Sequence, residues 1–149
     1  MARERLSPAL EQKALHIARS GLHLKADERG ENLFDHSIKV ASYAKTRGER
    51  IISYLHRVVD NSDITLKHLY STGFSKEIIR ALSCLSRRSG ESEQGQIQRI
   101  KRNPLATRIK LYDLLCETKP ETVESIPEPA RKSFLHAREV VQIQLLAPS

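Results

Sequence analysis

Three side chains in this sequence have the types and settings from which a chemical site can be built: His36, His56 and Asp113. Each lies in an apolar stretch with helical spacing, as Asp113 does between Leu111-Tyr112 and Leu114-Leu115. A carboxylate inside such a stretch is costly to bury unless it is paired or bound to a cation. Imidazole and carboxylate groups are also common ligands of Zn²⁺, Mn²⁺ and Fe²⁺. The spacing alone leaves two interpretations open: a metal site, or polar residues that are hydrogen-bonded in the core or lie on solvated helix faces.

The residue after His56 is Arg57, and its charge bears directly on this choice. A guanidinium keeps its proton and offers no lone pair to a metal. At ~4 Å and an effective dielectric constant of ~20, each contact between unit charges is worth about 4 kcal/mol, so Arg57 disfavours a neighbouring dication. If the side chain rotated outward, a site with three ligands would remain. We expect instead that the guanidinium lies between Asp60 and Asp113 and takes the place of a cation.

Helices must position these residues, because apolar residues recur at helical spacing along nearly the whole chain. Residues 25–32 form a polar loop without periodicity, and 119–127 form a linker that contains two prolines. There are no hairpin signals and no internal repeats. We predict an all-α fold in which residues 1–149 form a single compact bundle of about eight helices. Capping residues, glycines and prolines place these helices at about 7–20, 33–46, 49–59, 66–72, 76–85, 93–101, 104–118 and 128–146.

Size and charge narrow the classes of function. The chain has 149 residues, of which 39% are hydrophobic, which is enough for one domain with its own core. The net charge of +7 indicates an anionic partner or serves ordinary solubility. Nucleic-acid binding is not expected, because no recognition-helix signature, zinc finger or set of stacking aromatic residues is present.

The cysteines and the apolar segments indicate a compartment. Cys84 and Cys116 show no CxxC spacing and are interpreted as buried thiols in a reducing environment. Residues 1–5 lead into no apolar targeting segment, and no stretch approaches the ~20 apolar residues of a membrane span. We therefore expect a cytoplasmic protein that does not enter a membrane.

Short segments around the three candidate residues resemble one known family. They follow one another in a fixed order: Gly30…His36…Val40-Ala41, Leu55-His56-x-Val58-Val59, Asp63-x-Thr65, Gly73-Phe74, Gly90-Glu91-Ser92, Arg99-Ile100, Asn103-Pro104-x-Ala106 and Lys110-Leu111-x-Asp113-Leu114. Over about residues 14–118 this pattern resembles the HD-domain metal-dependent phosphohydrolases, in particular the small alarmone (ppGpp) hydrolases and the hydrolase domain of Rel/Spo-type stringent-response enzymes. The resemblance implies the helical fold of that family.

The resemblance also implies roles for individual residues. In the family, two histidines and two aspartates hold a divalent metal, usually Mn²⁺, and a Glu-Asp pair helps to activate water. By position, His36, His56 and Asp113 match three of the metal ligands. Arg57 stands where the remaining aspartate is expected, and Asp60-Asn61 stands where the catalytic Glu-Asp pair is expected. A further departure is Glu117, at a position where the family usually has asparagine.

Two hypotheses of function follow from this comparison. In the first, the protein is a degenerate HD-domain protein, a pseudoenzyme without a metal cofactor, that binds a guanosine polyphosphate-like nucleotide or a protein partner. In the second, it is an active phosphohydrolase or pyrophosphohydrolase that uses Mn²⁺ or another divalent metal and acts on ppGpp or a related nucleotide. The departures favour the first hypothesis. In both, Arg99 and Lys110 are candidates for binding nucleotide phosphates, with solvated helix faces as the alternative.

Overall fold

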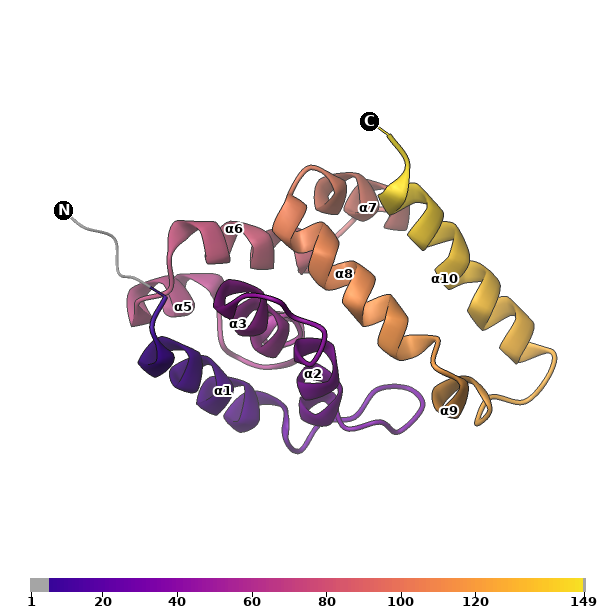
Figure 1. The fold of residues 1–149 in the computed structure, drawn as a ribbon, viewed down its shortest axis with the longest axis horizontal. Coiled ribbons are helices and arrows are strands. Elements are labelled where there is room, and N and C mark those ends of the chain that lie inside the picture. The colour runs from indigo at the N-terminus through magenta and orange to yellow at the C-terminus, as the bar shows by residue number, and fades with distance from the viewer. Residues whose placement is uncertain (1–5, 149) are drawn as a thin grey trace.

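Ten helices make up most of residues 6–148, the part of the chain that the computed structural model describes (Figure 1). Residues 1–5, from which we expect no targeting segment, and residue 149 lie outside the described part. The described residues form no strand, although Ala26 and Asn32 make an isolated antiparallel bridge. The predicted all-α class is confirmed. The helices are α1 (Pro8–Leu22), α2 (Leu33–Ala41), α3 (Arg47–Leu55), α4 (Val58–Asn61), α5 (Leu66–Thr72), α6 (Lys76–Leu85), α7 (Glu93–Lys101), α8 (Pro104–Glu117), α9 (Pro120–Val123) and α10 (Ala130–Leu146).

Polar side chains at the helix starts explain why most helices begin where they do. An N-cap side chain accepts a hydrogen bond from an amide in the first turn, which would otherwise lack a partner. At the other end of α5, Gly73 adopts a φ of 119°, a left-handed conformation that glycine tolerates best. Seven helices begin with such a side chain: Ser7, Asn32, Thr46, Thr65, Ser75, Ser92 and Asn103.

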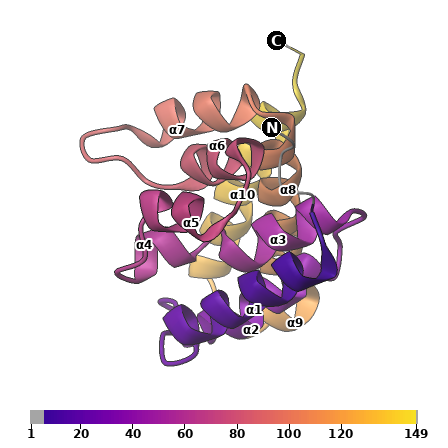
Figure 2. The same cartoon turned by 90° about the vertical axis from the view of Figure 1, so that its left-hand side faces the viewer.

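Helix α3 lies at the centre of the fold, packed against α1, α2, α6 and α8 (Figure 2). Its residues Ile51, Ile52 and Leu55 have no exposed surface and belong to the cluster of buried apolar residues that most of the helices share. A buried carboxylate, that of Glu49, joins α3 to α8 by accepting hydrogen bonds from Tyr112 Oη at 2.7 Å and Arg108 Nε at 3.1 Å. The central position of α3 fixes where its carboxyl-terminal end, and therefore His56, lies.

The structure differs from the sequence prediction at the end of α3. The helix expected over 49–59 is divided into α3 and α4, with His56 and Arg57 between them. The ring nitrogen Nδ1 of His56 lies 2.6 Å from the carbonyl oxygen of Ser53, which the Arg57 amide would use in a continuing α-helix. The interruption turns two successive side chains toward the same site.

Two further boundaries differ from the prediction. Helix α2 ends at Ala41 rather than near residue 46, because the chain continues in tight turns in which the amides of Tyr43 and Ala44 bond to carbonyls three residues back. The expected linker over 119–127 contains the short helix α9, which begins with Pro120 at its first helical position.

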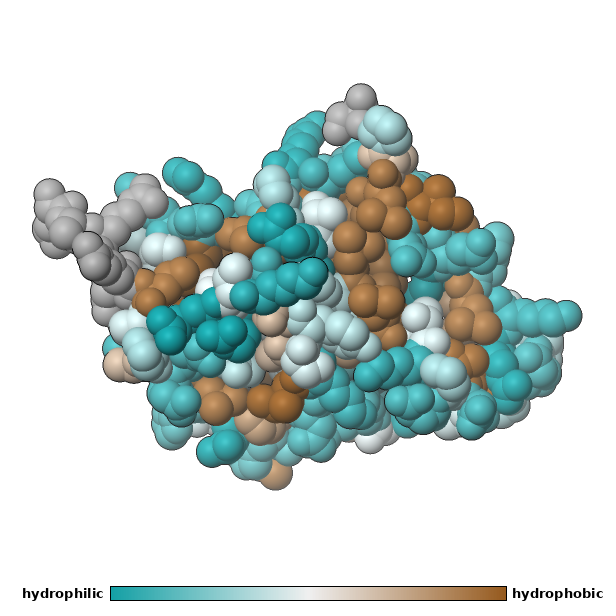
Figure 3. Space-filling view, in the orientation of Figure 1, coloured by the Kyte–Doolittle hydropathy of each residue, from teal (hydrophilic) through white to brown (hydrophobic). Residues whose placement is uncertain are grey.

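Helix α10 packs against α7 and α8 (Figure 1). Val141 and Leu145 of α10 are buried, and hydrophobic side chains follow the seam between α8 and α10 on the face shown in Figure 3. None of the described helices is long and apolar enough to cross a bilayer.

The central position of α3 predicts a large effect of truncating its core side chains. We expect Ile52→Ala to lower the free energy of unfolding by about 2–5 kcal/mol, because it leaves a cavity among fully buried neighbours. Leu24→Ala is the matched control, because Leu24 is 86% exposed and should change stability by less than about 0.5 kcal/mol. Urea denaturation followed by circular dichroism measures both variants. Equal effects of the two substitutions would contradict this description of the core.

Candidate functional site

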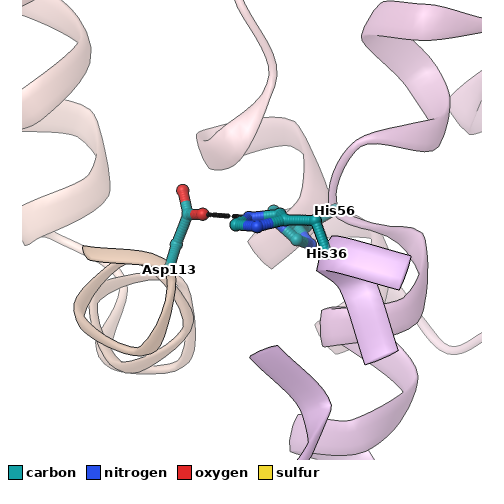
Figure 4. Close-up of side chains that lie close together, drawn as sticks. All are labelled: His36, His56 and Asp113. Atoms are coloured by element: carbon teal, nitrogen blue, oxygen red, sulfur yellow. Dashed lines mark hydrogen bonds and ion pairs between the residues drawn. The ribbon is translucent and has the colours of Figure 1, made fainter. Parts of the chain in front are cut away.

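The three candidate residues meet although they lie far apart in the sequence. His36 lies within α2, His56 directly follows α3 and Asp113 lies within α8, and each is at most 6% exposed. Figure 4 shows the Asp113 carboxylate pointing across to the two imidazole rings. One potential ligand atom from each residue lies within 4.8 Å of the other two. The cluster therefore has donor types and spacing that are found in metal sites.

His36 is held between two carboxylates. Its Nε2 lies 2.5 Å from Asp113 Oδ1, and its Nδ1 lies 3.1 Å from Glu31 Oε1, whose other oxygen accepts from Lys39 Nζ at 2.7 Å. Burial opposes protonation of His36, but the hydrogen bond and charge of Asp113 outweigh it and raise the pKa of the ring. A ring nitrogen must carry a proton to donate to a carboxylate, so this arrangement favours the imidazolium form, which has no lone pair for a metal.

His56 has the opposite electrostatic environment. Burial lowers the pKa of His56 and favours the neutral ring. Because Nδ1 donates to the Ser53 carbonyl, the lone pair of the neutral ring is on Nε2 and faces the site. Arg57 Nε lies 3.4 Å from this nitrogen and donates a long hydrogen bond to it.

The Arg57 guanidinium also contacts the carboxylate of the cluster. Its Nη2 lies 3.3 Å from Asp113 Oδ1 and 3.4 Å from Oδ2. Lys110, one turn earlier in α8, places Nζ 3.5 Å from Oδ2. Burial alone would raise the pKa of Asp113, but the charges of Lys110 and Arg57 and the hydrogen bond from His36 hold it well below its usual range. The carboxylate is therefore ionised and compensated by cations of the chain itself.

These contacts decide whether the cluster fits a metal ion in this conformation. His36 is hydrogen-bonded to two carboxylates, and the Nε2 lone pair of His56 accepts a hydrogen bond from Arg57. Both oxygens of Asp113 accept from the Arg57 guanidinium. A dication bound to the same three atoms would lie beside a fixed positive charge. The residues do not fit a divalent metal with Arg57 in this position.

The side chains of Asp60 and Asn61 are hydrogen-bonded to the backbone, and Asp60 does not contact the Arg57 guanidinium as predicted. Both oxygens of Asp60 accept from the backbone amide of Arg87 at 3.2 Å, and Asn61 Nδ2 donates to the Arg57 carbonyl at 2.8 Å. The expectation that the Arg57 guanidinium bridges Asp60 and Asp113 is thus corrected, since its carboxylate contacts are with Asp113. Asp60 lies in α4, and its side chain instead connects α4 to the segment after α6 through the Arg87 amide.

A cavity of about 850 Å³ opens beside the cluster. Arg57, Asp60, Asn61 and Lys110 line it together with Asp113, so several residues singled out in the sequence share one hollow. His56 also lines the cavity, whereas His36 lies behind it.

Arg99 is placed differently from the other candidates. Its guanidinium donates to the carbonyls of Ser83, Cys84 and Ser86 at 3.0–3.2 Å and to the Glu91 carboxylate. It does not line the cavity. These contacts bind the end of α6 to α7 and leave little of the guanidinium available for a phosphate.

The sequence analysis did not single out several residues of the site. Glu31 contacts His36, and Phe134 of α10 lies against two guanidinium groups, those of Arg138 at 3.5 Å and Arg29 at 4.9 Å from its ring centroid. The spacing of four residues between Phe134 and Arg138 was a usable signal for a shared helix face. No local pattern indicated that this face would form a wall of the cavity.

The contact between Arg57 and Asp113 predicts a measurable coupling. We expect Arg57→Met to lower the free energy of unfolding by about 1–3 kcal/mol, less than for a fully buried pair because Arg57 is 27% exposed. In a double-mutant cycle with Asp113→Asn, measured by urea denaturation, the two substitutions should couple by about 1 kcal/mol or more. Arg88→Met, on an exposed residue outside the cavity, is the control. Additive effects in the cycle would show that the guanidinium does not stabilise the carboxylate.

Comparisons with known proteins show the fold. No family model and no curated protein sequence matches the chain. Among solved structures, the chain is similar to a metazoan ortholog of SpoT that is described as hydrolysing ppGpp and playing a role in starvation responses. The TM-score is 0.75 and the sequence identity 16%, over 97% of this chain and 89% of that one. The resemblance to HD-domain ppGpp hydrolases that the sequence motifs indicate is therefore confirmed at the level of the fold.

Proposed function

We propose that this protein is a degenerate HD-domain protein that binds a nucleotide without a metal ion and does not catalyse metal-dependent hydrolysis. The observation that carries the proposal is the position of Arg57, whose guanidinium contacts both Asp113 and the lone pair of His56. These are the atoms that a metal would need. The fold alone does not decide the function, because activity depends on the residues of the site.

The charge balance of the cluster supports this proposal. By the resemblance, a relative with two aspartates and one dication has a net charge of zero at its metal centre. An aspartate and a dication together carry a charge of +1, and the Arg57 guanidinium carries the same charge, so the pair of Arg57 and Asp113 also sums to zero. The buried carboxylate of Asp113 thus keeps a partner of opposite charge without a metal. The arginine would thus act as a permanent cation that holds α8 against the turn after α3.

The remaining departures support loss of hydrolysis as well. General-base activation of water needs a carboxylate within hydrogen-bonding distance of that water. Asn61 is a neutral amide that donates to a backbone carbonyl, and both oxygens of Asp60 face a backbone amide. Asn61 therefore cannot act as a base, and the Asp60 carboxylate is hydrogen-bonded to the backbone of Arg87.

The proximity of His36, His56 and Asp113 favours an active phosphohydrolase as the second candidate. It requires the Arg57 side chain to rotate away from Asp113 and His36 to lose its proton. Three protein ligands with an open position are sufficient for a catalytic metal. The two candidates differ in whether the native protein holds a metal.

Metal binding distinguishes them. Under the proposal, the protein incubated with Mn²⁺ and passed through a desalting column retains no stoichiometric metal and releases no pyrophosphate from ppGpp. Arg57→Asp should bind Mn²⁺ at least about tenfold more tightly than the native chain, because it removes a positive charge and adds a carboxylate. Arg88→Asp, which makes the same change of charge outside the cavity, is the control and should have no effect.

One equivalent of Mn²⁺ in the native protein, lost in His56→Ala, would contradict the proposal and favour the enzyme. Circular dichroism verifies that each variant is folded. The measurement on the native chain tests the proposal even if Arg57→Asp does not fold.

A further inference from the structure

The charges that line the cavity beside the cluster limit what it can bind. Five cationic side chains and six carboxylates line its wall, so the cavity as a whole is not strongly positive despite the net charge of +7. A ligand with many negative charges needs compensation by cations or by bound metal. The ligand class therefore depends on which cations of the cavity have no carboxylate partner of their own.

Two of the five cations each have a carboxylate to themselves. Arg138 of α10 donates from Nε and Nη2 to Glu117 Oε2, at 3.2 and 2.8 Å, and from Nη1 to the Phe134 carbonyl. Arg29 is paired with Asp27 at 3.0 Å. Both pairs are electrically neutral, so they add little attraction for an anion.

The part of the cavity that is lined by Arg57, Lys110 and Asp113 has one positive charge in excess. Arg57 and Lys110 share the single carboxylate of Asp113, and the contact of Lys110 is long, at 3.5 Å. The remaining cation, Arg87, is exposed, and its backbone amide contacts the Asp60 carboxylate, which also lines the cavity. Arg57 and Lys110 are therefore positioned to meet about one anionic group, in the way that paired cations bind a phosphate.

The rest of the cavity disfavours further negative charge. Glu28 and Glu93 line it and are exposed, and no cation partner is found for either among the residues that the structure describes. Leu85, Phe134 and Ala137 also line the cavity and add apolar surface that is at least partly exposed. Such a lining suits an uncharged, partly apolar body better than a second phosphate chain.

We propose that the cavity binds a phosphate monoester, with its single phosphate group against Arg57 and Lys110 and an uncharged nucleoside body along α7 and α10. This inference rests on the proposed function, nucleotide binding without metal, and narrows its ligand class from nucleotides in general to nucleoside monophosphates. The volume of about 850 Å³ is ample for a nucleoside with one phosphate.

Isothermal titration calorimetry of the full chain in EDTA tests the inference. The probes are guanosine, GMP, GDP and ppGpp, the corresponding adenosine series as far as ADP, ribose 5-phosphate and inorganic phosphate. We expect the monophosphates to bind about tenfold more tightly than the nucleosides and the polyphosphates, the difference that one charge contact makes. Ribose 5-phosphate and inorganic phosphate should bind more weakly than GMP or AMP, because they lack the base.

Variants locate the phosphate. Lys110→Gln should weaken monophosphate binding about tenfold and leave nucleoside binding unchanged, because it removes the excess charge. Lys132→Gln is the matched control, on an exposed lysine of α10 outside the cavity, and should change neither. Equal loss of nucleoside and monophosphate binding in Lys110→Gln would contradict the placement of the phosphate.

The outcomes separate this inference from the proposed function. Affinity that rises with each added phosphate would overturn the inference and leave metal-free nucleotide binding intact. Inorganic phosphate that binds as tightly as GMP would overturn the role assigned to the nucleoside body. If no nucleotide binds, the proposed nucleotide-binding function fails, and the inference fails with it.

Discussion

A buried carboxylate, that of Asp113, is the constraint on which the arrangement of this site depends. It lies in α8 with 2% of its surface exposed, and an ionised carboxylate in such a place needs partners of opposite charge. His36 supplies one from α2, Arg57 supplies one from the turn after α3, and Lys110 supplies a weaker one from α8 itself. Three segments that are distant in the sequence are thus fixed relative to one another by one negative charge. Under the proposed function, the guanidinium takes the place that a metal ion has in the family that the sequence motifs resemble.

Under the proposed function, the same constraint explains how the site keeps its shape without a metal ion. Removing one partner of a buried charge pair leaves an uncompensated charge, whereas exchanging one cation for another keeps the pair intact. Under the proposed function, Arg57 is such an exchange. The imidazole of His56 still faces the cluster, because its orientation is set by the Ser53 carbonyl rather than by a metal. On this proposal, the fold and the geometry of the site are kept while the ligand of the site changes.

The fold class, most helices and the meeting of His36, His56 and Asp113 could be predicted from the sequence, because helical periodicity and capping residues are local and the motif order is specific. The break after Leu55 could not, because it depends on a hydrogen bond between a side chain and the backbone inside an apolar stretch. The role of Arg99 was equally hidden. A cluster of basic residues indicates phosphate binding, but the carbonyls at the end of α6 that occupy this guanidinium are a tertiary feature.

Metal-free binding requires the guanidinium of Arg57 to lie against Asp113 and His56 even when metal is present. The most direct measurement is a crystal structure of the native protein grown with millimolar Mn²⁺, with data collected at the manganese absorption edge. We expect continuous density for the guanidinium beside Asp113 and no anomalous peak within the cluster. An anomalous peak bound by His36, His56 and Asp113, with Arg57 turned outward, would contradict it.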